Sequence, residues 1–428
     1  MKALVIGGGG REHALIWGLS RSKRIKKIYC CQGNGGISGI AECINIDYND
    51  FNGLIDLVRT EWIDITVVGP EIPLSAGIVD AFRRSGHKII GPTQKAARLE
   101  GSKVFAKDFM RANRIPTAPY KVFTSQVHAR EHIRLMGAPI VIKADGLAAG
   151  KGVIVADNVE EALNAIDLIM VKRAFGDAGN KVIIEECLQG QEISFMVFTD
   201  GKTIIPMPGA QDHKRIYDGD KGANTGGMGA YCPVPILTPE LQQIVIDKVI
   251  RPTIGGLARD GVIYKGFLYA GLMIVEGKPF VLEYNCRFGD PETQPIIMKL
   301  DTDFFDILMA IEEEQLDKVD IKWKIGSSIC VVISASGYPG DYENGQIITG
   351  LNDIEEDDEL AVFHAGTSYV NGNFVTNGGR VLGVTAYGND INEARSKAYD
   401  VIKKIKFDGM YYRKDIGHLA IKSIEDYK

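Results

Sequence analysis

The first twenty residues constrain the fold most, because they join an apolar strand, a glycine loop and a helix in that order. Residues 2–6 (KALVI) are followed by four glycines and by a helical stretch over residues 11–19. Bare backbone N–H groups at a helix N-terminus hold anions, and this order opens nucleotide-binding βαβ units. The dinucleotide fingerprint is incomplete, since Glu12 stands where the third glycine belongs and no acidic residue ends the next strand. We predict a phosphate-binding loop without a nicotinamide cofactor.

Two further apolar strands end in similar turns. Residues 63–68 lead into residues 69–71 (GPE), and residues 88–90 lead into residues 91–93 (GPT). Loops at the carboxyl ends of parallel strands are where such sheets bind ligands. These segments are therefore candidates for ligand contact, although tight turns after strands would explain them equally well.

The composition is that of a large globular protein. The 428 residues exceed what one hydrophobic core usually supports, so we expect two to four domains. The net charge of −6 argues against broad nucleic-acid binding. Seven cysteines without metal-ligand spacing indicate reduced thiols in a cytoplasmic protein. No apolar run is long enough to cross a bilayer and no cleavable leader is evident, so we expect no membrane partner.

Residues 281–292 (VLEYNCRFGDPE) combine a strand with oxygen donors and a cation. Side chains alternate between the faces of a strand, so we predict that Glu283, Asn285 and Arg287 share one face. Glu283 and Asn285 offer oxygen ligands to Mg²⁺, which takes few protein ligands and completes its shell with water and nucleotide phosphates. Arg287 can hold a carboxylate or phosphate through two parallel hydrogen bonds. A solvated strand face is the alternative.

A second phosphate-seeking segment spans residues 138–155. Two β-branched strands flank a loop of small residues, with Lys143 before the loop and Lys151 at its end. The loop is suited to fold over phosphates. It is not a P-loop, because no helix follows Lys151 and no Ser or Thr accompanies it. A surface hairpin without a ligand is the alternative.

Other segments complete a nucleotide site. Lys103 and Lys107 lie one turn apart on a predicted helix, and a solvated lysine pair is the default interpretation. The strand over residues 181–186 can present backbone groups to an adenine. An acidic residue a few positions later can accept both ribose hydroxyls.

Residues 211–231 predict a long loop, because core-forming side chains are sparse there. Long loops in compact enzymes are usually functional or disordered. This one joins a charged stretch, residues 212–215 (DHKR), to a glycine-rich stretch, residues 224–229 (NTGGMG). His213 is a candidate general base, although a histidine in such a loop more often makes a structural hydrogen bond. From about Gly326 onward, short strands and an amphipathic helix predict a separate α+β domain that closes over the site.

With two phosphate-seeking loops, an adenine-type strand edge and a Glu-x-Asn strand in this order, the chain resembles the ATP-grasp superfamily. Within it, the chain resembles the glycinamide ribonucleotide synthetase (phosphoribosylamine–glycine ligase) family. The matching motifs cover nearly the whole chain and are GGGGREHA (7–14), GPE (69–71), LEGSK (99–103), IKADGLAAGKGV (142–153), DHKR (212–215), NTGGMGAY (224–231), LYAGLM (268–273), EYNCRFGDPE (283–292), GGRVL (378–382) and YRKDIG (412–417).

The resemblance implies a multidomain α/β and α+β fold. It has an N-terminal Rossmann-like (pre-ATP-grasp) domain over residues 1–102 and a small C-terminal α+β domain over residues 326–428. Between them lies a two-part ATP-grasp domain over residues 103–325, with a small mobile lid at about 121–190. The implied reaction joins glycine to 5-phosphoribosylamine through glycyl phosphate, and yields glycinamide ribonucleotide, ADP and phosphate in de novo purine biosynthesis. ATP is a substrate, Mg²⁺ or Mn²⁺ assists, and we expect a monomer or weak homodimer.

The same resemblance assigns roles to residues. Glu283 and Asn285 would bind the metal, Lys103 and Lys143 would hold ATP phosphates, and Glu192 would take the ribose hydroxyls. Adenine would lie at Glu185 and the backbone near Leu188. The covering loop contributes Gly146, Gly150, Lys151 and Gly152. Arg287 would stabilise charge on the transferred phosphoryl group, and the other catalytic candidates are Asp212 and Lys214. The remaining substrate contacts implied are Gly9, Gly10, Pro70, Glu71, Asn224, Thr225, Gly226, Gly227, Met228, Asp290 and Arg380.

Two other functions stay open at this stage. Another ATP-grasp ligase, such as a carboxylase that phosphorylates bicarbonate, would share the N-terminal and ATP-binding parts and differ in residues 211–231 and 284–292. A nucleotide-binding sensor without turnover is disfavoured by the intact metal and lysine residues. The incomplete fingerprint disfavours an NAD oxidoreductase.

Overall fold

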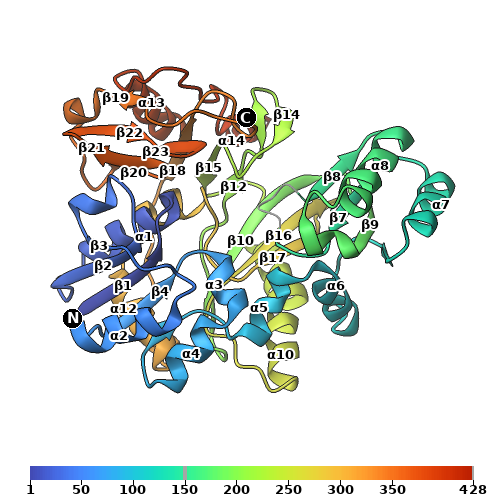
Figure 1. Cartoon of the computed structure of the whole chain (residues 1–428), viewed down its shortest axis with the longest axis horizontal. Coiled ribbons are helices and arrows are strands. Elements are labelled where there is room, and N and C mark those ends of the chain that lie inside the picture. The colour runs from blue at the N-terminus through green and yellow to red at the C-terminus, as the bar shows by residue number, and fades with distance from the viewer. Residues whose placement is uncertain (148–151, 427–428) are drawn as a thin grey trace.

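The computed structural model describes residues 1–147 and 152–426, with side chains of the last helix described through Lys422. The predicted nucleotide contacts Gly150 and Lys151 lie outside the described residues. The N-terminal part packs beneath the C-terminal part, a central sheet lies beside both, and a smaller unit extends from that sheet (Figure 1). The fold class matches the α/β and α+β architecture that the sequence predicts.

The N-terminal unit is a parallel sheet covered by helices on both faces. Its strand order is β3-β2-β1-β4-β5, and β1 pairs in parallel with both β2 and β4. The apolar run of β1 is buried on both faces, as parallel strands require. The elements are β1 (Lys2–Gly7), α1 (Gly10–Ser20), β2 (Lys27–Gln32), β3 (Glu42–Ile44), α2 (Phe51–Glu61), β4 (Ile65–Val68), α3 (Glu71–Ala76), α4 (Ile78–Arg84), β5 (Ile89–Ile90) and α5 (Gln94–Gly101).

The central sheet is antiparallel, in the order β11-β10-β16-β17. One face packs on a hydrophobic core that includes Phe195, Ala270 and Tyr284, together with the helices α9 and α10. The other face carries the polar side chains described below. The elements are α6 (Lys103–Ala112), β10 (Gln191–Thr199), β11 (Ile204–Pro206), α9 (Pro239–Val245), α10 (Arg251–Arg259), β16 (Gly266–Val275), β17 (Lys278–Asn285), α11 (Thr293–Lys299) and α12 (Phe304–Glu312).

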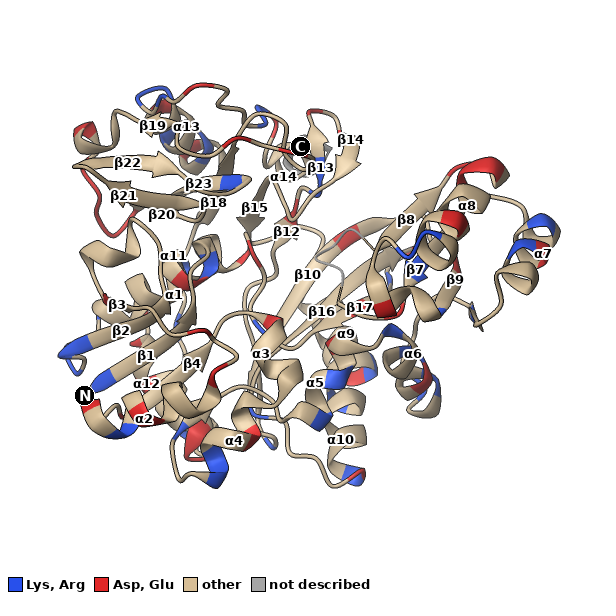
Figure 2. Ribbon diagram, in the orientation of Figure 1, with Lys and Arg blue, Asp and Glu red and all other residues tan. Residues whose placement is uncertain are grey.

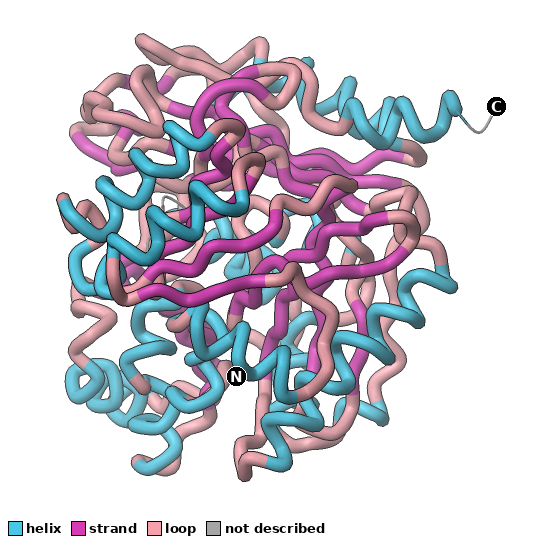
Figure 3. The backbone as a smooth tube through the Cα atoms, turned by 90° about the vertical axis from the view of Figure 1, so that its right-hand side faces the viewer, coloured by secondary structure: helices cyan, strands magenta, loops and turns pink. Residues whose placement is uncertain are grey.

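The extended unit, hereafter the lid, has its own small core. Its sheet order is β6-β9-β7-β8, and the two helices pack together as Figure 3 shows from the front. Strands β7 and β8 form the hairpin that the sequence predicts, with Ile140 opposite Ala156. The elements are β6 (Tyr120–Phe123), α7 (Gln126–Met136), β7 (Ile140–Ala144), β8 (Val153–Ala156), α8 (Val159–Ile166) and β9 (Val182–Glu186).

The prediction of a long loop over residues 211–231 is wrong. This segment contains strands β12 (Gln211–Asp212), β13 (Arg215–Tyr217), β14 (Lys221–Asn224) and β15 (Gly229–Cys232). β15 pairs with β18 (Ser327–Ser334), so the C-terminal sheet has the order β12-β15-β18-β23-β20. The pairing partner lies about a hundred residues away, and no local pattern announces it.

The rest of the C-terminal unit follows the prediction of short strands and an amphipathic helix. β23 lies between β18 and β20, and the last helix extends outward from the body at the end of the chain (Figure 3). The remaining elements are β19 (Ile347–Ile348), β20 (Leu360–His364), β21 (Thr367–Val370), β22 (Asn373–Thr376), β23 (Arg380–Gly388), α13 (Ile391–Ile402) and α14 (His418–Asp426).

The predicted alternation around Glu283 holds only in part. The pairing of β16 with β17 skips Leu282, which is a bulge, and β17 ends at Asn285. Glu283 and Asn285 therefore share a face as predicted. Arg287 lies beyond the strand, so its side chain is not placed by strand alternation.

Two other expectations concern the chain as a whole. All seven cysteines are free thiols. No helix in the described part of the chain is long and apolar enough to span a membrane.

A fragment ending at residue 325 tests the shared sheet. It loses β18, β20 and β23, which leaves β15 as an unpaired edge and uncovers the apolar side chains of Met228 and Tyr231. We expect an aggregating or non-cooperatively unfolding product without ATP turnover, measured by thermal melting and activity. A soluble fragment with native melting would contradict the shared core.

Two buried histidines at the contact between α1 and β20 predict a pH dependence of stability. The N–H of His364 donates to Nδ1 of His13 at 2.8 Å, and burial lowers the pKa of His13 to about 3 and of His364 to about 4. Below pH 6.5 the unfolded chain takes up protons that the folded chain does not. Stability should therefore fall on acidification, by about 1.4 kcal/mol per pH unit for each histidine.

The measurement is urea unfolding at pH 7, 6 and 5. The substitution His13→Asn keeps an acceptor without a titrating ring, so its stability should fall less steeply than that of the wild type. The exposed His128→Asn serves as the matched control and should follow the wild type. Parallel curves for His13→Asn and the wild type would rule out this account.

Candidate active site

The polar face of the central sheet is built by strand register. Ser194 of β10, Gly271 of β16 and Glu283 of β17 stand in one row across the sheet. Tyr269 and Asn285 are paired in the next row. A side chain at position 271 would meet Cγ of Glu283 at 3.3 Å, so the glycine leaves Glu283 room. The carboxylate of Glu283 and the amide of Asn285 therefore lie in neighbouring rows on the same face of the sheet.

Glu283 is surrounded by cations. Burial alone would raise the pKa of Glu283, but Lys214, Lys103 and Lys143 outweigh it and hold that pKa below its ordinary value. Burial lowers the pKa of Lys103, against the attraction of Glu283. The carboxylate is thus charged at neutral pH within a cluster that favours polyanions.

The oxygen ligands present suit Mg²⁺ better than a metal that is bound by protein side chains alone. Among the described residues, no three His, Cys, Asp or Glu side chains come together as a metal-binding group. One carboxylate and one amide oxygen lie adjacent at Glu283 and Asn285. This is the sparse protein contribution that Mg²⁺ accepts when phosphates and water complete its octahedral shell.

The lid meets this face through a buried carboxylate. Oε2 of Glu185 lies 3.0 Å from Nζ of Lys143 and 3.0 Å from Nζ of Lys107. Lys143 also donates to the carbonyl of Leu282 at 3.0 Å. Lys107 is 1% exposed, so the prediction of a solvated Lys103–Lys107 pair is wrong. A carboxylate from the lid, distant in sequence, compensates the lysine charge inside the protein.

The start of the covering loop is tied to α6. Nζ of Lys103 donates to the carbonyl of Gly146 at 2.9 Å. Oδ1 of Asp145 accepts from Ser102 Oγ at 2.9 Å and from the Val104 N–H at 3.1 Å. The predicted contacts Lys103, Lys143 and Gly146 are thus brought together at one end of the lid.

The predicted ribose contact is paired with a predicted catalytic residue. Glu192 Oε1 forms an ion pair with Lys214 Nζ. Burial by itself would lower the pKa of Lys214, but Glu192, Tyr269, Glu283 and Asp212 together outweigh it and raise that pKa. Leu188 lies between β9 and β10, in the segment that leads to Glu192.

Arg287 is held between two carboxylates. Its Nη2 lies 2.9 Å from Oε1 of Glu100, and its Nε lies 3.3 Å from Oε2 of Glu71. Oε2 of Glu100 also accepts from the N–H of Cys286 at 2.7 Å. The segment that follows β17 is therefore held against α5 and against the predicted Pro70-Glu71 turn.

The glycine loop of the N-terminus faces this region. The N–H of Gly9 donates to Glu12 Oε2 at 2.6 Å. A side chain on Gly10 would meet Gln294 Nε2 at 2.8 Å and Asp290 Oδ1 at 3.8 Å. The loop, the predicted Asp290 and the start of α11 are thus close neighbours. Pro70 lies against Gly7 of the same loop.

Arg380 joins the C-terminal unit to the same place. Its Nη2 lies 2.9 Å from Oδ2 of Asp290. Its Nη1 donates to the carbonyls of Gly226 at 2.6 Å and Asp290 at 2.8 Å. Gly227 has a positive φ of 111°, and a side chain there would lie 2.5 Å from Asp212 Oδ1. The structure brings all these predicted residues together.

Other members of the 224–228 segment lie differently. Thr225 folds back, with its N–H and hydroxyl both donating to the carbonyl of Lys214. The side chain of Met228 is fully buried in the core. Asn224 lines a cavity of about 450 Å³ between β8 of the lid, the β13–β14 hairpin and residues 339–340.

Beside Arg380 lies a group of buried acids. Burial, reinforced by the negative charge of Glu292, raises the pKa of Asp212 well above its ordinary value. Glu292 Oε1 accepts from Ser194 and Tyr269 at 2.8 Å each. Asp212 Oδ1 is buried with no hydrogen-bond partner among the described groups. Such an atom is free to accept from an ammonium or amine.

His213 has a structural contact. Its Nε2 accepts from the N–H of Gly417 at 3.1 Å, and its side chain is 1% exposed. Arg413, fully buried, ties the β13–β14 hairpin to the C-terminal segment through Asp220 and the carbonyl of Arg215, and also pairs with its neighbour Asp415. The histidine thus accepts a hydrogen bond from the C-terminal segment that Arg413 also anchors.

Four site residues were given no role in the sequence analysis. They are Glu12, Glu100, Lys107 and Glu292. Three lie inside motifs already quoted, GGGGREHA, LEGSK and EYNCRFGDPE, and an acidic residue in a glycine-rich motif was the available signal. Lys107 gave no signal, because a lysine one turn after another on a helix is typical of an exposed surface.

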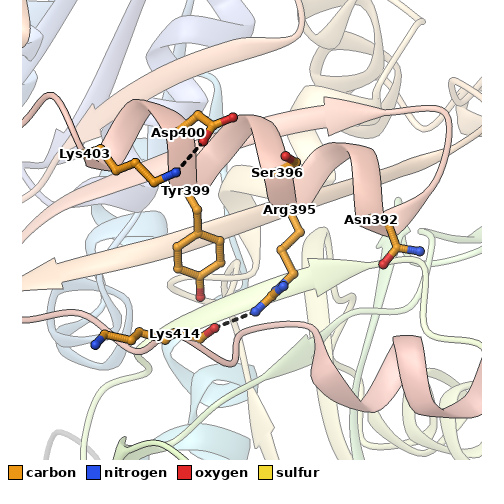
Figure 4. A pocket seen from close by; sticks show the side chains of 7 residues that line it. All are labelled: Asn392, Arg395, Ser396, Tyr399, Asp400, Lys403 and Lys414. Carbon is orange, nitrogen blue, oxygen red and sulfur yellow. Dashed lines mark hydrogen bonds and ion pairs between the residues drawn. The ribbon is translucent and has the colours of Figure 1, made fainter.

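A separate surface groove of about 320 Å³ lies on α13 (Figure 4). Two of its three cations are already engaged, since Arg395 donates to the carbonyl of Lys414 and Lys403 pairs with Asp400. None of its lining residues is a predicted site residue. Charged residues of both signs are interspersed across the molecule in Figure 2.

Solved structures place this arrangement among known folds. A phosphoribosylamine–glycine ligase from Thermotoga maritima superposes with a TM-score of 0.84 and 33% identity, covering 97% of this chain and 100% of that one. A biotin carboxylase from Campylobacter jejuni superposes with a TM-score of 0.73 at 16% identity, covering 98% and 94%. The second likeness shows the shared fold alone.

Sequence relatives and family models agree on one family. Proteins named phosphoribosylamine–glycine ligase are 52% identical in Vibrio parahaemolyticus, covering 98% of this chain and 99% of the relative, and 50% identical in Escherichia coli, covering 99% of each. Models of the phosphoribosylglycinamide synthetase N domain, ATP-grasp (A) domain and C domain match residues 1–100, 101–293 and 328–419. The chain belongs to the phosphoribosylglycinamide synthetase family.

Proposed function

We propose that this protein joins glycine to 5-phosphoribosylamine at the cost of ATP, and releases glycinamide ribonucleotide, ADP and phosphate. The observation that carries the proposal is the convergence of three domains on Arg287 and Asp290, just after the strand of Glu283 and Asn285, in a chain about half identical over its length to ligases of this name. The product is a precursor in de novo purine biosynthesis.

The chemistry starts from a poor electrophile. A carboxylate resists attack by an amine, so glycine is first phosphorylated by ATP to glycyl phosphate. The amine of phosphoribosylamine then attacks the acyl carbon, the C–O bond to phosphate breaks, and the amine nitrogen loses a proton. Phosphoryl transfer of this kind depends on positioning and charge neutralisation.

We assign the nucleotide to the polar face under the lid. Lys103 and Lys143 would neutralise phosphate oxygens, while Glu185 and the segment near Leu188 would receive the adenine. Glu192 would accept the ribose hydroxyls after Lys214 shifts away from it. Glu283 and Asn285 would hold Mg²⁺ or Mn²⁺, which supplies charge neutralisation between phosphates when bound.

We assign the two acceptors to the other side of Arg287. Arg287, oriented by Glu71 and Glu100, would stabilise charge on the transferred phosphoryl and acyl oxygens. The free Oδ1 of Asp212 would accept from the ammonium of glycine, and the Arg380–Asp290 pair with Gly226 and Gly227 would hold the second substrate. The glycine loop at Gly9 and Gly10 would face the ribosyl phosphate.

We propose the domain limits 1–102, 103–325 and 326–428, with β12 and β15 as central-domain strands contributed to the C-terminal sheet. We also propose a cytoplasmic location, which the seven free thiols accord with. A monomer or weak homodimer remains our proposal for the assembly, and sedimentation equilibrium at micromolar concentration decides it.

The first test of the function is ADP release from Mg-ATP. Phosphoribosylamine is generated in place from ribose 5-phosphate and ammonia, and reactions contain glycine, the amine, both or neither. We expect full turnover only with both acceptors. Turnover driven by bicarbonate would identify a carboxylase, and ATP binding without turnover would identify a sensor.

Glu283→Gln tests the proposed role of Glu283 as a metal ligand. It removes the charge but keeps the shape, so we expect kcat to fall at least about a hundredfold and the Mg²⁺ concentration for half-maximal activity to rise. Glu276→Gln, exposed in the turn of the same hairpin, is the matched control and should behave as the wild type. Full activity of Glu283→Gln would remove this residue from the metal site.

Arg380→Met tests the acceptor side. It leaves Asp290 and the carbonyl of Gly226 without their donor, so we expect KM for the acceptors to rise about ten- to a hundredfold with little change in KM for ATP. Lys403→Met, exposed directly after the end of α13, is the control. Equal effects of Arg380→Met on all three substrates would contradict the assignment.

A further inference from the structure

Lys107 is a charged side chain removed from water. Its side chain is 2% exposed, and α6 buries it between the lid and the central sheet. Burial lowers the pKa of Lys107 to about 8, with the carboxylate of Glu185 opposing that shift. A buried ammonium is costly unless it is paired and hydrogen-bonded. A methionine would fill this space without the cost, so the charge itself calls for a reason.

The partners of Lys107 place it between the lid and the central sheet. Its Nζ lies 3.0 Å from Glu185 Oε2 in the lid and donates to Thr117 Oγ1 at 2.6 Å. Thr117 Oγ1 in turn donates to the carbonyl of Val281 at 2.6 Å. The ring of Tyr120 lies 5.6 Å from the ammonium. Lys107 thus connects Glu185 to the strand that carries Glu283.

The two oxygens of Glu185 differ sharply. Oε2 receives both ammonium groups, Lys107 and Lys143, at 3.0 Å each. Oε1 is buried and has no hydrogen-bond partner among the described groups. An ionised carboxylate oxygen only accepts hydrogen bonds, so Oε1 matches a ligand that donates one. The 6-amino group of adenine donates, whereas the 6-oxo group of hypoxanthine accepts.

We propose that Lys107 is a positioning residue that fixes Glu185 with one oxygen free for the 6-amino group of the nucleotide base and leaves Lys143 free for the phosphates. The inference rests on the nucleotide site of the proposed function. Without Lys107, Lys143 is the remaining ammonium on Glu185, and the carboxylate draws it away from the nucleotide. Lys107 acts through Glu185 and not by contact with a substrate, because its ammonium is held by Glu185 Oε2 and Thr117 Oγ1.

The test is Lys107→Met, with ATP and ITP as probes. Calorimetric binding of each nucleotide to the full chain is measured without acceptors, and ligase kinetics are measured separately. We expect ATP affinity to fall about tenfold or more and the preference for ATP over ITP to shrink by a similar factor. KM for ATP should rise by more than kcat falls.

A double variant separates positioning from packing. In the Lys107→Met background, Glu185→Gln removes the charge that captures Lys143, so part of the lost affinity for nucleotide phosphates should return. This is measured with ADP and ITP as well as ATP. A residue that only fills the core gives no such rescue.

Two further variants guard against misfolding. Lys299→Met is the matched control, because Lys299 is 3% exposed and donates to the carbonyls of Lys324 and Gly326. It should lower the melting temperature without changing the ATP to ITP ratio. Thr117→Val removes the hydrogen bond from Lys107 and the one to the carbonyl of Val281 but keeps the Lys107–Glu185 pair, and should shift the ratio in the same direction as Lys107→Met by a smaller factor.

The outcomes are distinct. If Lys107→Met lowers the melting temperature as Lys299→Met does, with unchanged nucleotide binding and an unchanged ratio, the inference is overturned. If Thr117→Val leaves the ratio of ATP to ITP affinity unchanged, the inference is overturned even where Lys107→Met does not fold. Loss of ATP preference in the binding assay supports the inference even if glycine and phosphoribosylamine fail to stimulate turnover, and that failure would reject the ligase function alone.

Discussion

The site depends on buried charges that find their counter-charges in other elements of the fold. Glu283 of the central sheet is balanced by lysines from α6, the lid and the segment after β12. Arg287 is held by Glu71 and Glu100, which come from α3 and α5. An unpaired charge in the interior costs several kcal/mol. The domains therefore cannot separate without exposing the site to that cost, and the site cannot form before they meet.

The same arrangement prepares the protein for ligands. Several buried polar atoms at the site lack partners among the described groups, including Glu185 Oε1, Asp212 Oδ1 and Gln294 Oε1. Each such atom is destabilising in the free protein, because it has left water without a replacement hydrogen bond. A bound substrate that supplies the missing donor recovers this free energy. Preorganised charges of this kind stabilise a transition state without rearranging during the reaction.

The C-terminal unit bounds the acceptor side of the site. β15 carries the end of the glycine-rich segment into the C-terminal sheet, and Arg380 at the start of β23 grips Asp290 and Gly226. Arg413 fixes the neighbouring hairpin from the C-terminus. The acceptor side is thus set by rigid strands, and the nucleotide side is bounded by a smaller unit with its own core.

The sequence by itself determined the local elements and the chemistry they carry. The strand and glycine loop at residues 2–10, the hairpin around Lys143 and the pair Glu283–Asn285 follow from patterns with short periods, because neighbouring residues along a strand or turn obey fixed geometry. Tertiary structure decided what those residues touch. The pairing of β15 with β18, the bulge at Leu282, the place of Arg287 between two carboxylates and the burial of Lys107 all arise from partners distant along the chain. The local sequence predicts a solvated side chain for Lys107, because the carboxylate that pairs with it, Glu185, is brought to it only by the tertiary fold.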